Sequence, residues 1–152
     1  SGYTAKIAGT EAGITEPKPT FSACFGAPFL PLHPGFYAKM LGEKIREQEV
    51  HVWLINTGWS GGAYGKGERI PLPYTRAIVS AILEEKLGNC NWKLHPVFHF
   101  AMPETCPGIP DKLLNPEFSW KNPIEYRLKA RELAVHFIEN LKNTKIRCRA
   151  RF

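Results

Sequence analysis

The sequence has no apolar run that approaches the roughly 20 residues a helix needs to cross a bilayer. Its first residues, SGYTAKIAGTEAG, lack the charged and then apolar layout of a signal peptide. The four cysteines (Cys24, Cys90, Cys106 and Cys148) are far apart and form no CxxC pair, so we expect reduced thiols rather than disulfides. These absences argue against a membrane protein and predict a soluble protein of the cytoplasm.

A complete phosphate-binding P-loop is also missing. The stretch GWSGGAYGKGER comes near the Walker pattern GxxxxGK[ST], but Ser60 stands at the leading glycine position. Gly67 follows Lys66, where the pattern requires a metal-binding hydroxyl. Five glycines and two cations in so short a loop are nevertheless costly unless the backbone approaches something closely. On the residues alone, a nucleotide contact and a flexible connection are equally open interpretations.

The sequence shows no triad, no zinc cluster and no nucleophile beside a base. His95 and His99 are four residues apart, but the alternating pattern VFHFA places them on a strand, where four residues span roughly 13 Å. A shared metal ion is therefore not expected. We predict no catalytic residue and no metal ligand in this chain.

The composition suits one folded unit, because 152 residues that are 43% hydrophobic can bury a core. The formal net charge of +6 is compatible with nucleic acid, an acidic surface or a phosphorylated small molecule as a partner. Five of the twenty Lys and Arg residues lie within 142–152, so the rest of the chain is only mildly basic.

Residues 50–87 have the order strand, glycine-rich loop and helix. Residues 50–55 are mostly apolar, with β-branched and aromatic side chains, and predict a buried strand. Loop 57–68 follows, and then an apolar-periodic helix from about Pro73 that closes at Gly88. Its apolar face is formed by Tyr74, Ala77, Ile78, Ala81 and Ile82. Because such a loop often presents N–H groups to an anion, we expect a phosphate-bearing ligand here.

The remaining segments predict further helices and strands. Strands are expected at 3–8 and after Pro96, and helices with a buried apolar stripe from Pro34 and from Asn122, the latter as N-cap. Irregular chain is expected at 20–32 and 103–116 because of its prolines. The succession of helices and strands predicts an α/β fold.

Two residues at the end of the glycine-rich loop are candidates for ligand contacts. Arg69 carries a planar guanidinium that can stack on a base or pair with a phosphate. Thr75 lies in the first turn of the predicted helix, where capping is the simpler role. Segment 9–19 has the glycines and prolines of a lid, although its composition alone favours an ordinary surface loop.

The segments GYTAKIAGTEAGITEPKPTFSACFGAPFLPLHP and VWLINTGWSGGAYGKGERIPLPYTRA resemble the C-terminal part of ATP-dependent phosphoenolpyruvate carboxykinase, and the likeness extends from Ser1 to about Lys142. The resemblance implies one partial domain, 1–152, of a nucleotide-binding α/β fold with a mixed sheet and flanking helices. It also implies a part in converting oxaloacetate and ATP to phosphoenolpyruvate, ADP and CO2, as in gluconeogenesis. The implied cofactors are ATP with Mg²⁺ and Mn²⁺.

The resemblance also assigns residues. Arg69, Ile70 and Thr75 match ATP contacts of the family within an adenine-side motif at 57–76, and segment 9–19 matches its mobile active-site loop, which reverses the preference for an ordinary loop. The family's P-loop, metal ligands and oxaloacetate-binding arginines precede the matched segment. We therefore expect this chain to be inactive alone, with metal ligands upstream.

The alternative is a non-catalytic basic module that binds nucleotides or nucleic acid through the cations of 142–152. The tail NTKIRCRARF does not look like the usual ending of the family. Under the first interpretation, that of a carboxykinase fragment, the partners are oxaloacetate and ATP, with no nucleic acid and no membrane.

Overall fold

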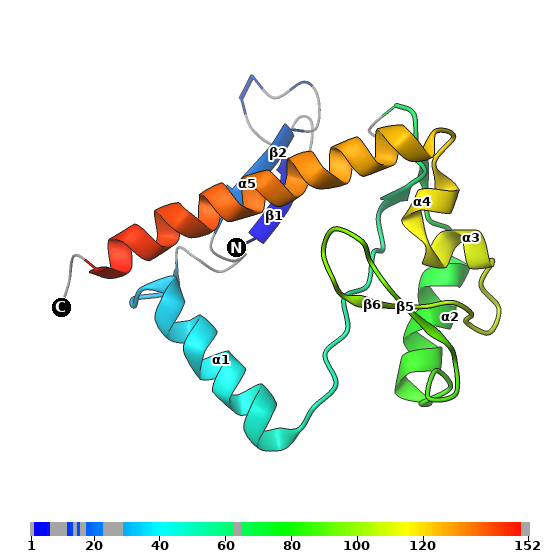
Figure 1. Cartoon of the computed structure of the whole chain (residues 1–152), viewed down its shortest axis with the longest axis horizontal. Coiled ribbons are helices and arrows are strands. Elements are labelled where there is room, and N and C mark those ends of the chain that lie inside the picture. The colour runs from blue at the N-terminus through cyan, green and yellow to red at the C-terminus, as the bar shows by residue number, and fades with distance from the viewer. Residues whose placement is uncertain are drawn as a thin grey trace. The chain divides into compact units, whose positions relative to one another are not determined.

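The computed structural model describes residues 2–6, 12–13, 15, 18–22, 29–62 and 65–149. The chain divides into two compact units (Figure 1), the first made of residues 1–53 and 135–152 and the second of residues 54–134. Of the proposed lid, segment 9–19, residues 9–11, 14 and 16–17 lie outside the described residues, and residues 18–19 begin strand β2 (Lys18–Ser22).

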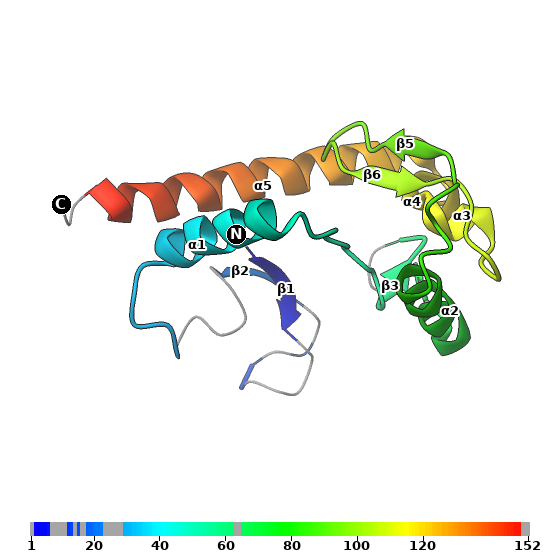
Figure 2. The same cartoon turned by 90° about the horizontal axis from the view of Figure 1, so that it is seen from below.

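The first unit contains a β-hairpin beside the end of a long helix. Strands β1 (Gly2–Lys6) and β2 (Lys18–Ser22) pair antiparallel, with Tyr3 opposite Phe21. The Phe21 ring lies edge-on to His136 and Phe137 of α5 (Pro123–Arg149), with centroids 5.7 and 5.3 Å away. Figure 2 shows the hairpin beside this part of α5.

The hairpin confirms one prediction and corrects another. The strand expected at 3–8 is present as β1, although residues 7–8 lie outside the described residues. The irregular segment expected at 20–32 was wrong for residues 20–22, because these belong to β2. Prolines at 28 and 31 were the reason for expecting irregular chain, but β2 ends before them.

Helix α1 (Pro34–Gln48) confirms the helix predicted from Pro34. His33 caps it, since its Nδ1 accepts a hydrogen bond from the N–H of Gly35 at 3.0 Å. None of the 15 residues of α1 is buried, and Leu41 is 61% exposed. The core role predicted for its apolar stripe was therefore wrong for the described structure.

The second unit is built around α2 (Leu72–Leu83). Two short antiparallel hairpins accompany it, β3 (Trp59–Ser60) with β4 (Glu68–Arg69), and β5 (Trp92–Leu94) with β6 (Ala101–Pro103). Two one-turn helices follow them in the chain, α3 (Asp111–Leu114) and α4 (Pro116–Ser119). Ala81 of α2 packs with Leu87, Cys106 and Ile109 in a buried cluster. Ala77, Ile78 and other partly buried residues of the predicted helix face surround that cluster, which confirms the face.

Four local predictions in this region were wrong in whole or in part. Residues 50–55, expected to form a buried strand, form no strand and are exposed, and Leu54 is 82% exposed. Of the strand expected after Pro96, only Ala101 and Met102 lie in a strand, β6, and residues 96–98 form a turn between β5 and β6. Helix α2 ends at Leu83 with Glu84 as C-cap, so Gly88 does not close it. Segment 103–116, expected to be loop, includes the single turn of α3.

The last helix has the predicted start but not the predicted burial. Asn122 is its N-cap, since Oδ1 accepts hydrogen bonds from the N–H of Ile124 at 2.9 Å and of Glu125 at 3.4 Å. The stripe expected in the core is exposed at Ile124 (66%), and it is likewise exposed at Leu128, Val135 and Ile138.

The α/β prediction is confirmed at the level of mixed helices and small antiparallel sheets. Cys90 and Cys106 are free thiols, as expected. None of the helices among the described residues combines the length and the apolar character that spanning a bilayer requires.

The exposed apolar stripe of α5 generates the first prediction. The chain made alone should bind a hydrophobic dye in its native state and self-associate, because uncovered apolar faces favour association. Leu128→Lys should reduce dye binding while changing the unfolding free energy by no more than about 0.5 kcal/mol, since the side chain is exposed. Dye fluorescence, light scattering and thermal melts measure this, and a sharp cooperative transition in a monodisperse sample would contradict it.

Candidate functional site

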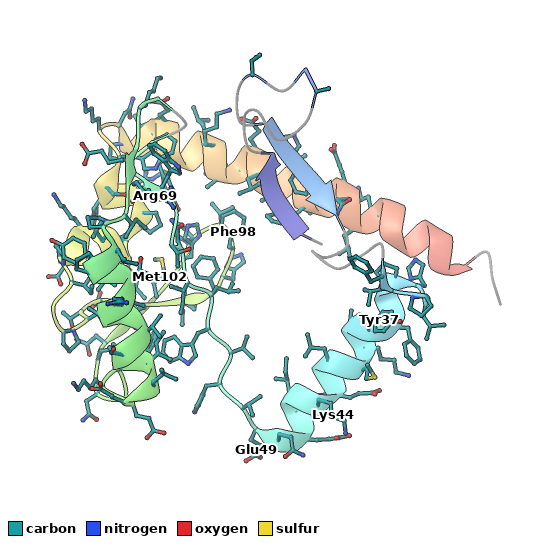
Figure 3. All side chains as sticks on the ribbon, turned by 180° about the vertical axis from the view of Figure 1, so that it is seen from behind. Tyr37, Lys44, Glu49, Arg69, Phe98 and Met102 are labelled. Carbon is teal, nitrogen blue, oxygen red and sulfur yellow. The ribbon has the colours of Figure 1, made fainter. Side chains whose placement is uncertain are left out.

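The β3–β4 hairpin places Arg69 immediately before α2. Trp59 lies opposite Arg69 and Ser60 opposite Glu68, and the N–H of Ile70 donates to the carbonyl of Gly58 at 2.8 Å. Residues directly opposite on an antiparallel pair project from the same face. Both Trp59 and Arg69 are exposed, so this face of the hairpin offers an aromatic ring and a guanidinium. Figure 3 labels Arg69 near the start of α2.

Asn56 shapes the entrance to this hairpin. Its Oδ1 accepts a hydrogen bond from the N–H of Gly58, and its Nδ2 donates to the carbonyl of Trp59, both at 3.0 Å. An asparagine side chain that bonds backbone two residues ahead forms an Asx turn. The chain is therefore bent just where β3 begins.

Packing within the protein accounts for several glycines of loop 57–68. A Cβ on Gly61 would lie 2.8 Å from the carbonyl oxygen of Ser119, and one on Gly67 would lie 2.6 Å from the carbonyl oxygen of Gly62. Gly61 and Gly65 also have positive φ, at 82° and 79°, which glycine adopts most readily. The close backbone approach inferred from the sequence is thus present, but its partners are protein atoms.

Helix α2 starts without a side-chain cap among the described residues. Its N-cap is Pro71, whose carbonyl accepts from the N–H of Tyr74 at 3.0 Å and of Thr75 at 3.3 Å. Thr75 is half-buried in the first turn, and its hydroxyl makes no capping hydrogen bond, so the simpler role considered for it is not observed. A helix N-terminus carries partial positive charge, which adds to the charge of the exposed Arg69.

The three predicted contact residues differ in exposure. Arg69 is exposed, Ile70 is only 9% exposed and Thr75 is intermediate. The N–H of Ile70 is already bonded to Gly58. A ligand could therefore meet Ile70 only through its carbonyl or the small exposed part of its side chain, whereas the Arg69 guanidinium is available.

Lys66, the second cation of the loop, has a partner. Its Nζ lies 3.5 Å from Oε1 of Glu125, and both side chains are well exposed. Exposed pairs of this kind contribute little to stability, so a stronger anion could replace the carboxylate. Among the described residues, no group of three or more His, Cys, Asp or Glu side chains is arranged to hold a metal ion.

His95 is the buried polar residue that the sequence did not reveal. Its side chain is 1% exposed, between β5 and the turn that leads to β6. Nδ1 accepts hydrogen bonds from the N–H groups of Val97 and Phe98, both at 3.1 Å, and Nε2 lies 2.6 Å from the hydroxyl of Tyr126. Because Nδ1 accepts twice, the proton of the neutral ring is on Nε2, which then donates to Tyr126.

Charge and burial around His95 favour this neutral form. Burial lowers the pKa of His95; the nearby carboxylate of Glu117 opposes this shift, and His99 reinforces it. Burial also raises the pKa of Tyr126, and Glu117 adds to that effect. Glu117 itself pairs with Arg127, whose Nε donates to its Oε1 at 2.8 Å. His95 is thus a structural group, and His99 is an exposed residue with φ of 58°.

Comparison with known proteins gives a consistent result. Residues 1–112 match the family model described as phosphoenolpyruvate carboxykinase. The chain is 55% identical over 142 residues to phosphoenolpyruvate carboxykinase (ATP) of Christiangramia forsetii, and 56% identical over 142 residues to the protein of that name from Thermus thermophilus. Each match covers 93% of this chain and 27% of the relative, so the chain spans about a quarter of their length. These relatives support the first interpretation and not the alternative of a basic binding module.

The environment of His95 generates the second prediction. Because its folded pKa lies below the ordinary value of 6.5, the unfolded chain takes up a proton first as the pH falls. The contribution of neutral His95 to the unfolding free energy is therefore fully present above pH 6.5, and it is lost as the pH falls through the lowered folded pKa. His95→Asn keeps an acceptor for the turn but cannot titrate, so its unfolding free energy should be lower at neutral pH and should fall less on acidification.

Denaturant titrations between about pH 5 and 8 measure this slope. His51→Asn is the matched control, because His51 is exposed and this variant should keep the slope of the unchanged protein. An identical slope in His95→Asn and the unchanged protein would contradict the prediction.

Proposed function

The chain belongs to the ATP-dependent phosphoenolpyruvate carboxykinase family, and on that premise we propose that it forms the adenine side of the nucleotide site in a complete carboxykinase. That enzyme converts oxaloacetate and ATP to phosphoenolpyruvate, ADP and CO2. The observation that carries the proposal is Arg69, exposed on a short hairpin directly before the uncapped start of α2.

The proposed contacts follow from the exposure of each residue. The Arg69 guanidinium pairs with a phosphate or stacks on the base, since its planar fork suits both. Trp59 shares its face and borders the same ligand. Thr75 offers a hydroxyl from the first turn of α2, and Ile70 supplies its carbonyl or the exposed edge of its side chain. Together these residues of motif 57–76 bind and orient the nucleotide.

The rest of the machinery is proposed for the remainder of the complete enzyme. Phosphoryl transfer depends on metal ions that neutralise the phosphates, and the described residues offer no fitting donor set. Mg²⁺ and Mn²⁺ would therefore bind elsewhere in the complete protein. Segment 9–19 is proposed to be the lid of the active site, and residues 1–152 to be one partial domain of the enzyme. The complete enzyme is proposed to act in the cytoplasm, in gluconeogenesis.

Arg69→Ala in the complete carboxykinase tests the assignment. We expect KM for ATP to rise about tenfold or more, because a charge-assisted contact contributes roughly 1.5–3 kcal/mol, while KM for oxaloacetate stays within about twofold. Steady-state kinetics with each substrate varied measure the two constants. Arg131→Ala, an exposed arginine on α5, is the control and should leave both unchanged. Equal effects of Arg69→Ala on both substrates would contradict the nucleotide assignment.

The isolated chain should show no carboxykinase activity with ATP, oxaloacetate and both metals present, because no three His, Cys, Asp or Glu side chains among the described residues are grouped to hold a metal ion. Its binding to ATP should be weak, since only adenine-side contacts remain. A coupled assay for phosphoenolpyruvate and equilibrium dialysis with labelled ATP measure these properties. Turnover by the purified chain would contradict the division of roles proposed above.

A further inference from the structure

We propose that helix α4 positions the β3–β4 hairpin for nucleotide binding, with Ser60, Gly61 and Ser119 as positioning residues that act through Arg69. This inference rests on the proposed function, because it concerns the same site. It adds residues that lie far apart in the sequence and outside the matched contact residues.

A chain of hydroxyl groups joins the hairpin to α4. The Ser119 hydroxyl donates to the carbonyl of Pro116 at 2.8 Å, and it lies 2.9 Å from the hydroxyl of Ser60. A hydroxyl has one proton to donate. Ser119 therefore accepts from Ser60, and the direction Ser60 to Ser119 to Pro116 is fixed. Both serines are partly buried, so water competes less for these bonds than it does at the surface.

Gly61, the residue after Ser60, packs against the C-terminal end of α4. A Cβ at Gly61 would lie 2.8 Å from the carbonyl oxygen of Ser119 and 3.8 Å from its carbonyl carbon. The clash would be with backbone, which cannot turn aside as a flexible side chain can. The hairpin can therefore approach the end of α4 only because residue 61 is a glycine.

The contact of Ser60 and Gly61 with α4 lies close enough to Arg69 along the hairpin to set the position of its side chain. Ser60 pairs with Glu68, and the adjacent pair is Trp59 with Arg69. A ladder of two residue pairs is too short to hold its own orientation, so outside contacts must fix it. Ile70, through its bond to Gly58, holds one end of the ladder, and α4 holds the other.

A further contact links this loop to α5, and it is weaker than the contacts with α4. Lys66 and Glu125 are separated by 3.5 Å and both are exposed, so solvent screens their attraction. The serine pair and the close packing of Gly61 are thus the contacts that set the hairpin position.

Gly61→Ala and Gly65→Ala in the complete carboxykinase provide a matched comparison. Both residues have φ near 80°, so both variants carry the same type of backbone strain, but a Cβ at Gly65 meets nothing within 4 Å. Gly61→Ala should raise KM for ATP about tenfold or more, since a displacement near 1 Å of a contact residue has effects of that order. KM for oxaloacetate should stay within about twofold, and Gly65→Ala should raise KM for ATP much less.

Ser60 tests the hydroxyl chain independently. Ser60→Ala should raise KM for ATP by about threefold to tenfold, in line with one lost hydrogen bond. Ser60→Thr keeps a hydroxyl, so its KM for ATP should stay near that of the unchanged enzyme. Thermal melts of every variant show whether a kinetic change reflects loss of folding. A merely structural role would lower the melting temperature and affect both substrates alike.

The outcomes separate the two proposals when Arg69→Ala is measured beside them. If Arg69→Ala raises KM for ATP but Gly61→Ala matches Gly65→Ala, the positioning role is overturned and the proposed function stands. If Arg69→Ala leaves KM for ATP unchanged, the proposed function and the positioning role both fail. Selective loss of ATP affinity in Arg69→Ala, Gly61→Ala and Ser60→Ala, with rescue by Ser60→Thr, supports both.

Discussion

The packing of α2 against the turn that holds Cys106 and Ile109 fixes the position of the candidate site. Ala81 and its neighbours on one face of α2 fill this small core, and burial of apolar surface is the dominant favourable term in folding. Arg69 and Ile70 immediately precede α2, so the start of that helix determines where the guanidinium is held. The buried Ile70 links the hairpin to this arrangement, while Arg69 stays exposed.

His95 holds the β5–β6 hairpin in position. Its ring nitrogens bond to the turn between β5 and β6 on one side and to Tyr126 of α5 on the other. A buried polar group is costly unless it is hydrogen-bonded, and here both ring nitrogens have partners. The same residue therefore shapes the turn and attaches it to the start of α5. The Phe98 and Phe100 rings lie tilted by 37° to the His95 ring, at centroid distances of 5.0 and 4.9 Å.

Features set by neighbouring residues were predictable, whereas features set by distant partners were not. The start of α1, the face of α2 and the Asn122 cap follow from local spacing and were predicted from it. The strand expected at 50–55 failed because an apolar, β-branched run does not show whether a partner strand exists. The hydrogen bond between Ser60 and Ser119 spans 59 residues, and no spacing rule reaches that far. Arg69 and Thr75 were candidates from their position and chemistry, and the family resemblance added Ile70 and the assignment to ATP. The bonding that surrounds these residues required the structure.

The glycine-rich loop shows why residue content alone is weak evidence for a ligand. Its glycines indicated a close approach of backbone, and the structure contains one, but at Gly61 and Gly67 the approaching atoms are carbonyl oxygens of the protein itself. Those glycines would be needed whether or not a nucleotide binds. The argument for nucleotide binding therefore depends on family membership and on Arg69, whose charge is exposed and has no ion-pair partner among the described residues. Gly61 serves that site indirectly, because it allows the hairpin that carries Arg69 to lie against α4.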